Sequence, residues 1–498
     1  MSRTRRSIEI PSLGAFDREA GALGRQLAQG LRAAIARGEL KAGELLPSTR
    51  TLAASLGLSR GTVMEAFEQL IAEGYLEAQV GAGTRVVLPV QAWDCAAPGD
   101  TAARPPAAPK LPPQALRYAA MARQLAALPA VPFAIAIPGG AAAPDEQWRR
   151  VGNRVRASRL GAPAPYGDPR GVAGLREAVA DYVRRARAVH CEPEQVLITG
   201  GTQQGLYLAG RVLLSPGDAV WVEDPGYAGL TALVEEFGVR ALRVPVDRQG
   251  MDVALAAAAC PQARAAFVTP SHQHPLGMPL SMARRQALLA WAQRQDAWIV
   301  EDDYDSELRY AGHPFPSLQS LDPARVIYLG TFSKVLFPSL RLGYAVMPEP
   351  LVEAFAGLRV LMDRHSPTAE QQALAAYMRE GHFEAHIRRI RGAYAQRRAV
   401  LIAAIEQSLS EWITLEPCDQ GMHLVGWLRE GLDDVAVAAA ALDAGIALRA
   451  VSPMYATERR RHGLMFGFGG FSAEQLRAAV AGLRRVLEQA EEATAAAA

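Results

Sequence analysis

From about residue 130 onward, short runs of β-branched and other apolar residues alternate with segments of helical periodicity. The runs read VLITGG, AVWVEDPGY, AAFVTPSHQ, AWIVEDD and VIYLGTFSK. Strands that alternate with helices favour a mainly parallel sheet that is covered on both faces. From about residue 375, long Arg-rich helices and a late strand-like run, LMFGFGG, indicate a smaller α+β subdomain. We therefore expect an α/β domain over residues 131–490.

The N-terminal segment is organised differently and is mainly helical. Ser48 or Thr49 is placed to cap a short helix that ends near Gly57, and Ser59 is placed to cap a second helix over residues 60–73. Two helices joined by a tight turn that contains glycine form a helix-turn-helix. The GAGTR run that follows predicts a β-hairpin wing.

Composition separates these two parts and limits the class of protein. Residues 91–130 are rich in Ala and Pro without an apolar period, which predicts a linker after an N-terminal domain over residues 1–90. No apolar run reaches the roughly 20 residues of a membrane helix, and no secretory signal is recognisable. The four cysteines lack CxxC spacing, so we expect reduced thiols in a cytoplasmic protein and no metal site. With a net charge of +2, any binding of nucleic acid must depend on local basic residues.

Lysine is rare in this chain. Of 53 basic residues only Lys41, Lys110 and Lys334 are lysines, and all the others are arginines. An amine can form a Schiff base, whereas a guanidinium cannot. Lys41 and Lys110 are consistent with ordinary surface residues, but the neighbours of Lys334 in TFSKVLFPSLRLGY point to chemistry.

Those neighbours match the needs of pyridoxal phosphate, which requires an amine, an anion at its pyridine nitrogen, a phosphate site and a flat stacking partner. Ser333 and Arg341 suit the phosphate. Asp302 lies near the end of the strand-like run AWIVEDD, where a carboxylate would keep the pyridine nitrogen protonated, and Tyr304 would reach the ring hydroxyl. IVEDD could instead be a magnesium-binding Walker B motif, but the chain contains no GxxxxGK[ST] loop.

Two further motifs upstream complete the set. In VLITGGTQQGLYLAG, the backbone N–H groups of Gly201, Thr202 and Gln203 would open a helix, and helix N-termini bind phosphate. Tyr227 follows the next strand and is placed to stack on the cofactor ring. Each motif alone is common, and the prediction depends on their combination.

The N-terminal motifs resemble a known DNA-binding family. The run LPSTRTLAASLGLSRGTV, followed by LIAEGYLEAQVGAGTRV, is similar to the GntR-family winged helix-turn-helix over its whole length. The resemblance implies that double-stranded DNA is contacted by Arg50, Ser59, Arg60 and Thr62, with Gly83 and Thr84 in the wing. Met64 stands where some members have an arginine, so their base preference does not transfer.

The rest of the chain resembles fold-type I aminotransferases, and more narrowly the MocR/GabR-type regulators that join such a domain to a GntR head. The motifs that carry this resemblance are YGDPRG, GGTQQ, EDPGY, TPSHQHPLG, EDDYDSE and FSKVLFPSLRLGY. It implies that Lys334 forms the aldimine with pyridoxal phosphate, and that the ring is held by Asp302, Tyr304 and Tyr227. It also implies a phosphate site built by Gly201, Thr202, Gln203, Ser333 and Arg341. Tyr166 would reach the phosphate of a partner subunit, in a homodimer that exchanges heads and bodies.

The chain departs from the aminotransferase pattern at two positions. His274 stands before a proline where aminotransferases usually have an asparagine that contacts the ring. Met465, in LMFGF, stands where an arginine would hold the substrate carboxylate, and a thioether cannot replace a guanidinium. The sequence does not decide whether Arg449 compensates.

Three functions are therefore weighed. The complete head counts against an enzyme with an incidental DNA-binding segment, and the intact lysine motif counts against a scaffold without cofactor. We expect a DNA-binding transcriptional regulator that binds pyridoxal phosphate and senses an amine, an amino acid or pyridoxal phosphate itself. An active aminotransferase is the alternative, and a partial transamination half-reaction is compatible with the regulator.

Overall fold

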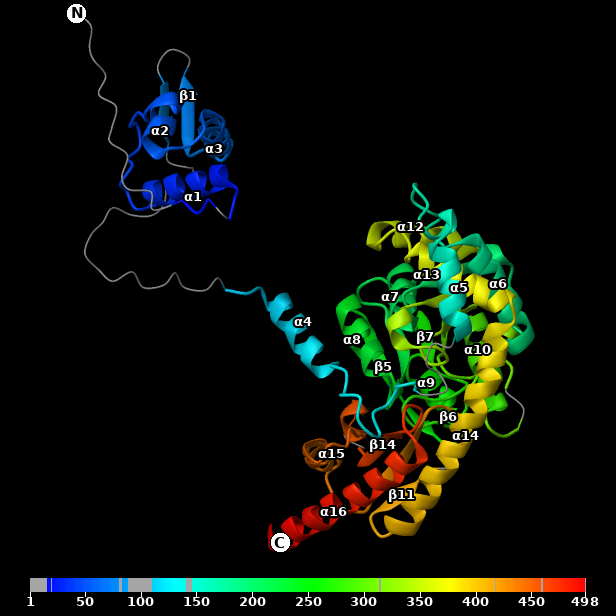
Figure 1. Ribbon diagram of the computed structural model, residues 1–498. Coiled ribbons are helices and arrows are strands. Elements are labelled where there is room, and N and C mark those ends of the chain that lie inside the picture. Colours follow the sequence, from blue (N-terminus) through cyan, green and yellow to red (C-terminus); the bar gives the residue numbers. More distant parts are fainter. Residues whose placement is uncertain are drawn as a thin grey trace, which may run out of the picture. The chain divides into compact units, whose positions relative to one another are not determined.

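The computed structural model describes residues 16–18, 20–79, 83–87, 110–139, 146–312, 315–416, 418–457 and 460–497. The chain divides into two compact units, residues 1–110 and residues 111–498 (Figure 1). We call them the N-terminal unit and the C-terminal unit and describe each by itself.

The N-terminal unit is a small helical domain with a hairpin. Its elements are α1 (Leu23–Ala36), α2 (Thr49–Leu56), α3 (Arg60–Ala72), β1 (Leu76–Gln79) and β2 (Gly83–Val86). Leu27 and Leu31 of α1 are buried against Val63 and Phe67 of α3, and this apolar contact forms the core.

The predicted helix-turn-helix is confirmed, including its caps. The Ser48 side chain accepts a hydrogen bond from the backbone of Thr51 at the start of α2, which ends at Gly57 with a left-handed φ of 64°. The Ser59 side chain accepts one from the backbone of Thr62 at the start of α3. Each bond satisfies an N–H group that would otherwise lack an intrahelical partner. β1 and β2 pair antiparallel as a wing, and the first two residues of the GAGTR run lie outside the described residues.

The C-terminal unit contains most of the secondary structure. Its α-helices are α4 (Pro113–Gln124), α5 (Glu146–Arg156), α6 (Ala173–Arg187), α7 (Thr202–Leu213), α8 (Ala228–Phe237), α9 (Val253–Ala259), α10 (Met282–Gln295), α11 (Leu318–Leu321), α12 (Val352–Met362), α13 (Thr368–Arg379), α14 (His382–Ser408), α15 (Asp434–Asp443) and α16 (Ala473–Ala497). Its 3-10 helices are η3 (Arg159–Gly161), η4 (Pro193–Gln195), η5 (Pro338–Leu340), η6 (Glu349–Leu351) and η7 (Ser452–Met454). Its strands are β3 (Val196–Thr199), β4 (Ala219–Asp224), β5 (Arg240–Asp247), β6 (Gly250–Met251), β7 (Ala265–Val268), β8 (Trp298–Asp303), β9 (Val326–Thr331), β10 (Gly343–Val346), β11 (Ile413–Leu415), β12 (His423–Leu428), β13 (Arg449–Ala450) and β14 (Gly463–Gly467).

Eight strands form the main sheet, in the order β3-β10-β9-β8-β7-β4-β5-β6. The five neighbours from β9 to β5 are parallel, whereas β10 and β6 run antiparallel to the strands they pair with. Along β4, Trp221 stacks on Trp291 of α10 at 3.8 Å, while Val220 and Val222 belong to the core cluster that contains Leu206 of α7. Alternate side chains thus enter two different cores, and the predicted mainly parallel sheet with helices on both faces is confirmed.

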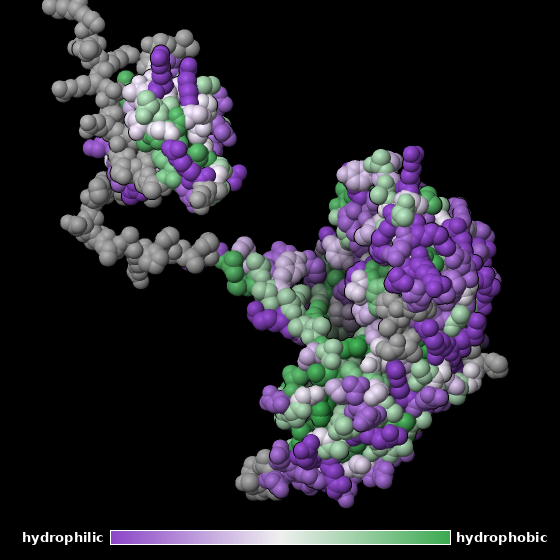
Figure 2. Space-filling model, viewed as in Figure 1, coloured by the Kyte–Doolittle hydropathy of each residue, from purple (hydrophilic) through white to green (hydrophobic). Residues whose placement is uncertain are grey.

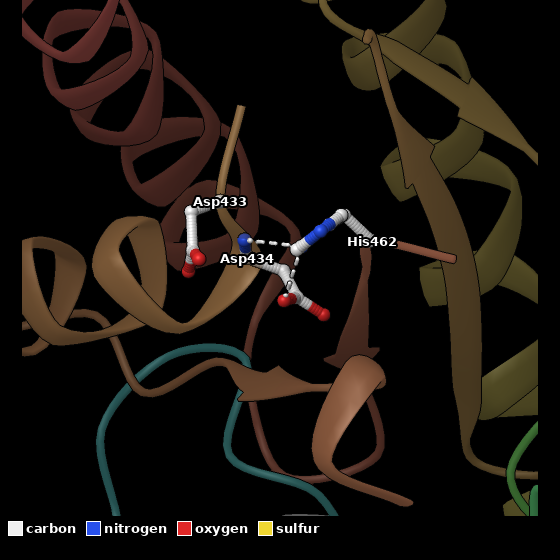
Figure 3. Close-up of side chains that lie close together, drawn as sticks. All are labelled: Asp433, Asp434 and His462. Carbon is white, nitrogen blue, oxygen red and sulfur yellow. Dashed lines mark hydrogen bonds and ion pairs between the residues drawn. The ribbon is translucent and has the colours of Figure 1, made fainter. Parts of the chain in front are cut away.

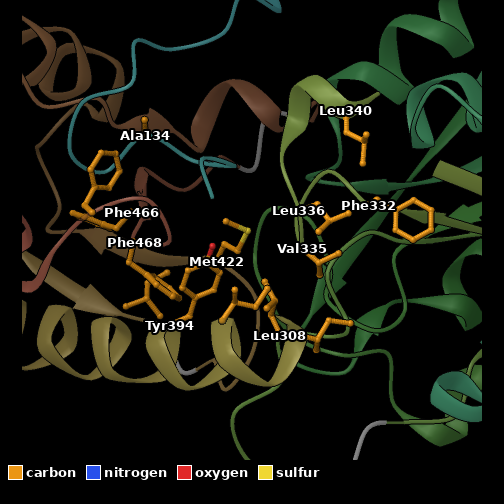
Figure 4. Close-up of a cluster of buried hydrophobic side chains, with 14 of the residues drawn as sticks. Ala134, Leu308, Phe332, Val335, Leu336, Leu340, Tyr394, Met422, Phe466 and Phe468 are labelled. Carbon is orange, nitrogen blue, oxygen red and sulfur yellow. The ribbon is translucent and has the colours of Figure 1, made fainter. Parts of the chain in front are cut away.

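The predicted smaller subdomain is also present. Its four antiparallel strands follow the order β11-β12-β14-β13, and α14 packs against α16 beside them. Its core is continuous with that of the main sheet. Figure 4 shows this cluster running from Phe466 and Phe468 through Met422 and Leu308 to Val335, the residue after Lys334.

Helix α4 lies within the stretch predicted as a linker, so part of that stretch is helical. The Tyr118 hydroxyl donates to the Glu236 carboxylate of α8 at 2.6 Å, and Arg117 pairs with the same carboxylate at 3.0 Å. Leu116 and Leu125 stay exposed, and Figure 2 shows apolar side chains along this helix. Among the described residues, no helix is long and apolar enough to cross a membrane.

Candidate cofactor site and nucleic-acid interface

The candidate cofactor site lies where the parallel strands of the main sheet end. The strands β4, β7, β8 and β9 end at Asp224, Val268, Asp303 and Thr331. In an open parallel sheet, ligands bind outside the carboxyl ends of the strands, because the loops that follow meet there. The sequence motifs with Tyr227, His274, Tyr304 and Lys334 occupy these loops.

Asp302 is buried without a hydrogen bond to one of its oxygens. Asp302 is 8% exposed, and its Oδ1 has no hydrogen-bond partner. Burial first, and then the neighbouring Asp303 carboxylate, raise the pKa of Asp302 to about 7, while Lys334 opposes the shift. A buried carboxylate of this kind is stabilised by a cationic partner, so the residue fits the predicted role beside a protonated pyridine nitrogen.

The adjacent acid, Asp303, is fully engaged on one oxygen instead. Its Oδ2 accepts hydrogen bonds from Arg187 at 2.9 Å, from Ser306 at 2.9 Å and from Tyr328 at 2.6 Å. These contacts fix the end of β8 to α6 and β9. The Oδ1 atoms of both acids are buried without a partner, but Asp303 is also tied into the fold through Oδ2, so Asp302 is the better candidate to meet a ligand.

Lys334 lies in the loop after β9 and is half-buried. Burial lowers the pKa of its amine, Asp305 and Asp302 raise it, and Arg341 lowers it, with a net decrease. A lowered pKa increases the neutral fraction of an amine, which is the form that attacks a carbonyl. The buried Val335 and Leu336 that follow hold this loop against the core.

The predicted phosphate residues converge at the start of α7. Gly201 precedes this helix with φ 107°, and a Cβ added there would lie 3.3 Å from the Arg341 guanidinium. The Ser333 hydroxyl is buried without a partner. Gln203 donates to the carbonyl of Gly229 at 3.2 Å and leaves its own oxygen unpartnered. An N-terminal helix turn, a guanidinium and a free hydroxyl together fit a phosphate.

Tyr304 contacts a buried ion pair, His272 with Asp305, that the sequence did not reveal. His272 Nδ1 lies 2.9 Å from the Asp305 carboxylate and 3.1 Å from Tyr304 Oη. Burial lowers the pKa of His272, but Asp305 and then Cys418 raise it to about 10. A protonated Nδ1 has one hydrogen, which faces the Asp305 carboxylate, and it cannot accept a hydrogen bond from Tyr304; the Tyr304 hydroxyl hydrogen is therefore left to donate to a ligand. The sequence shows His272 in the SHQH run and Asp305 in the DDYD run, but only the fold shows that these two side chains are in contact.

His274 lies beside Tyr227 and Tyr304, and its surroundings favour the neutral form of its ring. Burial first, and then the charges of His423 and Lys334, lower the pKa of His274 well below its usual value. Its Nδ1 is unpartnered, and its ring meets that of Tyr227 edge to face at 5.7 Å. Tyr227 and Asp302 line the same recess at the ends of β4 and β8. The departure from asparagine therefore leaves a polar ring within the candidate site.

Tyr166 is separate from these residues within this chain. It is 76% exposed, and the Arg364 guanidinium lies over its ring at 4.5 Å. His365 lies near the same ring, at 6.3 Å between centroids.

The candidate DNA-contacting residues gather near the starts of α2 and α3. Arg50, Ser59 and Arg60 are exposed, and Thr62 is half-buried. The Ser59 hydroxyl lies 2.8 Å from the Thr62 hydroxyl as part of the cap, so these two side chains also have a structural role. In the wing, Gly83 is exposed and Thr84 is half-buried.

One acidic cluster has ligand types that could hold a metal ion: Asp433, Asp434 and His462 (Figure 3). Both oxygens of Asp434 and one oxygen of Asp433 already accept hydrogen bonds. Asp434 accepts from the backbone of Val451, Ser452 and Gly463 and lies 2.9 Å from His462 Nδ1. Asp433 caps α15. The cluster joins α15 to the small sheet and offers little free coordination.

Comparison with protein families matches both units. Residues 23–86 match the model of bacterial regulatory proteins of the gntR family, and residues 137–483 match aminotransferase class I and II. The chain is 38% identical over 476 residues to the probable rhizopine catabolism regulatory protein MocR of Rhizobium meliloti, covering 94% of both chains. It is 34% identical over 455 residues to the HTH-type pyridoxine biosynthesis transcriptional regulator PdxR of Corynebacterium glutamicum, covering 91% of this chain and 93% of PdxR.

Solved structures similar to the chain include aminotransferases. The α-aminoadipate aminotransferase LysN of Thermus thermophilus, in complex with N-(5'-phosphopyridoxyl)-L-leucine, has a TM-score of 0.67 and 28% identity, covering 72% of this chain and 92% of LysN. The kynurenine aminotransferase of Pyrococcus horikoshii has a TM-score of 0.67 and 25% identity, covering 76% of this chain and 95% of the enzyme.

Proposed function

The chain belongs to the MocR/GabR-type family, in which a GntR winged helix-turn-helix precedes an aminotransferase class I and II domain, and we propose that it is a transcriptional regulator that binds pyridoxal phosphate and a small amine-bearing ligand. The observation that carries this proposal is the set of buried, unpartnered polar atoms near Lys334, above all Asp302 Oδ1 and Ser333 Oγ. Buried polar atoms without partners are rare in proteins, and these match the two polar ends of the cofactor.

Each residue has one task in this proposal. Bound pyridoxal phosphate supplies an aldehyde and an electron-withdrawing ring. Lys334 is the amine that would hold the cofactor at its aldehyde, and Asp302 would hold the ring nitrogen in its protonated form. The Tyr304 hydroxyl donates to the ring oxygen while His272 and Asp305 fix its position. Ser333, Arg341 and the N–H groups at the start of α7 hold the phosphate.

DNA binding is proposed for the N-terminal unit. Arg60 and Arg50 contact phosphates or base edges beside the start of α3, and the wing with Gly83 and Thr84 contacts the adjoining backbone. A ligand amine would take the position of the Lys334 amine, and we propose that the release of Lys334 alters the loop after β9 and thereby the affinity for the operator. Pyridoxal phosphate itself is a second candidate for the sensed ligand.

We further propose a homodimer in which Tyr166 reaches the phosphate of the partner subunit. Its large exposure, beside a cation and a second aromatic ring, supports a surface that is covered by another protein surface. Sedimentation at micromolar concentration should give the mass of a dimer, and a monomer with full cofactor affinity would contradict this assignment.

The test separates the two units. With pyridoxal phosphate, the wild type should show an absorbance band of a C=N bond that borohydride bleaches; Lys334→Ala should lack it, and Lys110→Ala should retain it. Arg60→Ala should weaken DNA binding in mobility-shift assays and leave the band unchanged. A wild type without the band, or a joint loss of both properties in Arg60→Ala, would contradict the proposal. Sustained transamination of an amine against a keto acid would favour an aminotransferase instead.

A further inference from the structure

Arg449 carries a guanidinium that the described residues leave incompletely paired. Its Nη2 donates to the carbonyl of Ala126 at 3.4 Å, its Nε is buried without a partner, and no acidic side chain within the described part of the chain forms an ion pair with it. Burial lowers the pKa of this guanidinium, and the nearby Tyr227 phenol raises it. A half-buried cation that lacks an anion is costly unless a ligand supplies one.

The strand register shows where this side chain goes. Arg449 of β13 lies directly opposite Met465 of β14. In an antiparallel pair, residues that lie opposite each other project from the same face of the sheet. On that face Met465 packs with Leu276 and Met278, which belong to the loop that also carries His274.

The electrostatics agree with this placement. The positive charge of Arg449 is one of the influences that lower the pKa of His274, after burial and the charges of His423 and Lys334. It also opposes the rise that burial and Asp302 cause in the pKa of Tyr227. The guanidinium therefore influences two side chains of the candidate site, in agreement with the placement that the strand register gives.

We propose that Arg449 binds the carboxylate of the ligand, so that the sensed molecule is an amino acid rather than a simple amine. This inference rests on the proposed function and deepens it. The planar guanidinium with several N–H donors matches a carboxylate, which accepts two parallel hydrogen bonds. The proposed phosphate site consists of Ser333, Arg341 and the start of α7. Arg449 comes from the small sheet and is therefore available for a second anion, the ligand carboxylate.

The test compares matched pairs of ligands that differ only in the carboxylate: L-alanine with ethylamine, L-leucine with isoamylamine, and L-phenylalanine with phenylethylamine. Dissociation constants for the cofactor-loaded protein are measured by calorimetry. Loss of a hydrogen bond to a charged group predicts that the wild type prefers the acid of at least one pair by about 10- to 100-fold. Arg449→Met should abolish this preference and keep the borohydride-sensitive band. Arg248→Met, at a side chain that is 89% exposed, is the matched control and should change neither.

A second variant tests the geometry. Because positions 449 and 465 share a face, the double variant Arg449→Met/Met465→Arg should restore at least part of the preference for the carboxylate. The inference is overturned if a wild type with the band prefers the acid in no pair, or if Arg449→Met keeps the preference. Binding of the amine-free acids, propionate and 3-phenylpropionate, to Lys334→Ala distinguishes the two proposals. If Lys334→Ala, which lacks the band, binds these acids and the additional change Arg449→Met removes that binding, the carboxylate site is supported independently of the cofactor link. If Lys334→Ala does not bind the acids, the result counts against the carboxylate site.

Discussion

Replacement of Asp302 by asparagine should stabilise the cofactor-free protein, and it should do so more at alkaline pH. In the folded chain burial and then Asp303 raise the pKa of Asp302 to about 7, from 3.8 for an unperturbed aspartate. The folded state therefore holds a proton that the unfolded state releases between these two values. The stability of the wild type must fall as the pH rises through this range, and the fall ends above the folded pKa.

The size of the effect follows from the shift. Between pH 5 and pH 7 the wild type loses about 1.4 kcal/mol per pH unit at this group, or about 3 kcal/mol in total. Asparagine has no charge to lose. The free energy of unfolding of Asp302→Asn relative to wild type should thus increase by about 3 kcal/mol from pH 5 to pH 8. Glu301 and Glu307 also have a pKa raised to about 7, but they are common to both proteins and cancel in the difference. Glu223, whose pKa is also raised to about 7, repels the Asp302 carboxylate, so loss of that charge eases its ionisation and adds to the stabilisation of the variant at high pH.

The assay is urea unfolding of the cofactor-free proteins at equal concentration, followed by tryptophan fluorescence at both pH values. Asp296→Asn is the control, because Asp296 is exposed and its hydrogen bond with Arg325 lowers its pKa. The pKa of Asp296 lies below pH 5, so the free energy of unfolding of Asp296→Asn should differ from that of wild type by the same amount at pH 5 and at pH 8. Saturating pyridoxal phosphate should then stabilise the wild type more than Asp302→Asn. A difference between Asp302→Asn and wild type that is the same at both pH values would refute the reasoning.

Three further predictions concern single contacts. Gly343→Ala should lower the free energy of unfolding by about 1–3 kcal/mol and weaken cofactor binding, because the added Cβ would lie 2.8 Å from Gly201 Cα. Thermal unfolding and cofactor titration measure the two effects, and an unchanged melting temperature would contradict the prediction. Ser59→Ala should destabilise α3 by about 1 kcal/mol, seen as faster hydrogen exchange there and not in α7; equal exchange rates would show that the cap contributes nothing. Asp434→Ala should lower the free energy of unfolding by on the order of 3 kcal/mol, because several backbone N–H donors lose their acceptor. Zinc or magnesium should not raise the melting temperature of the wild type, and stabilisation by either ion would indicate a metal site instead.

Local signals in the sequence predicted much of this molecule. The caps at Ser48 and Ser59 and the alternation of strands and helices depend on neighbours in the chain, so the helix-turn-helix and the parallel sheet could be inferred directly. The same holds for the position of Lys334 just after a buried strand.

Contacts between distant segments could not be predicted in this way. The pairing of His272 with Asp305 joins two loops whose meeting depends on the order β4-β7-β8. The sequence shows a methionine at position 465 in place of a guanidinium, but only the register of β13 with β14 shows that Arg449 projects from the same face. The helix α4 was missed because alanine- and proline-rich composition hides a short helix that begins at a proline.

The central claim is the covalent link between Lys334 and pyridoxal phosphate, and the scarcity of lysine makes it directly testable. The loaded protein is reduced with borohydride, digested and mapped by mass spectrometry. Because the chain has only three lysines, the phosphopyridoxyl group can be assigned without ambiguity. The account predicts the group on Lys334, in stoichiometric yield. Its presence only on Lys41 or Lys110, or an unmodified Lys334 in protein saturated with cofactor, would contradict the account.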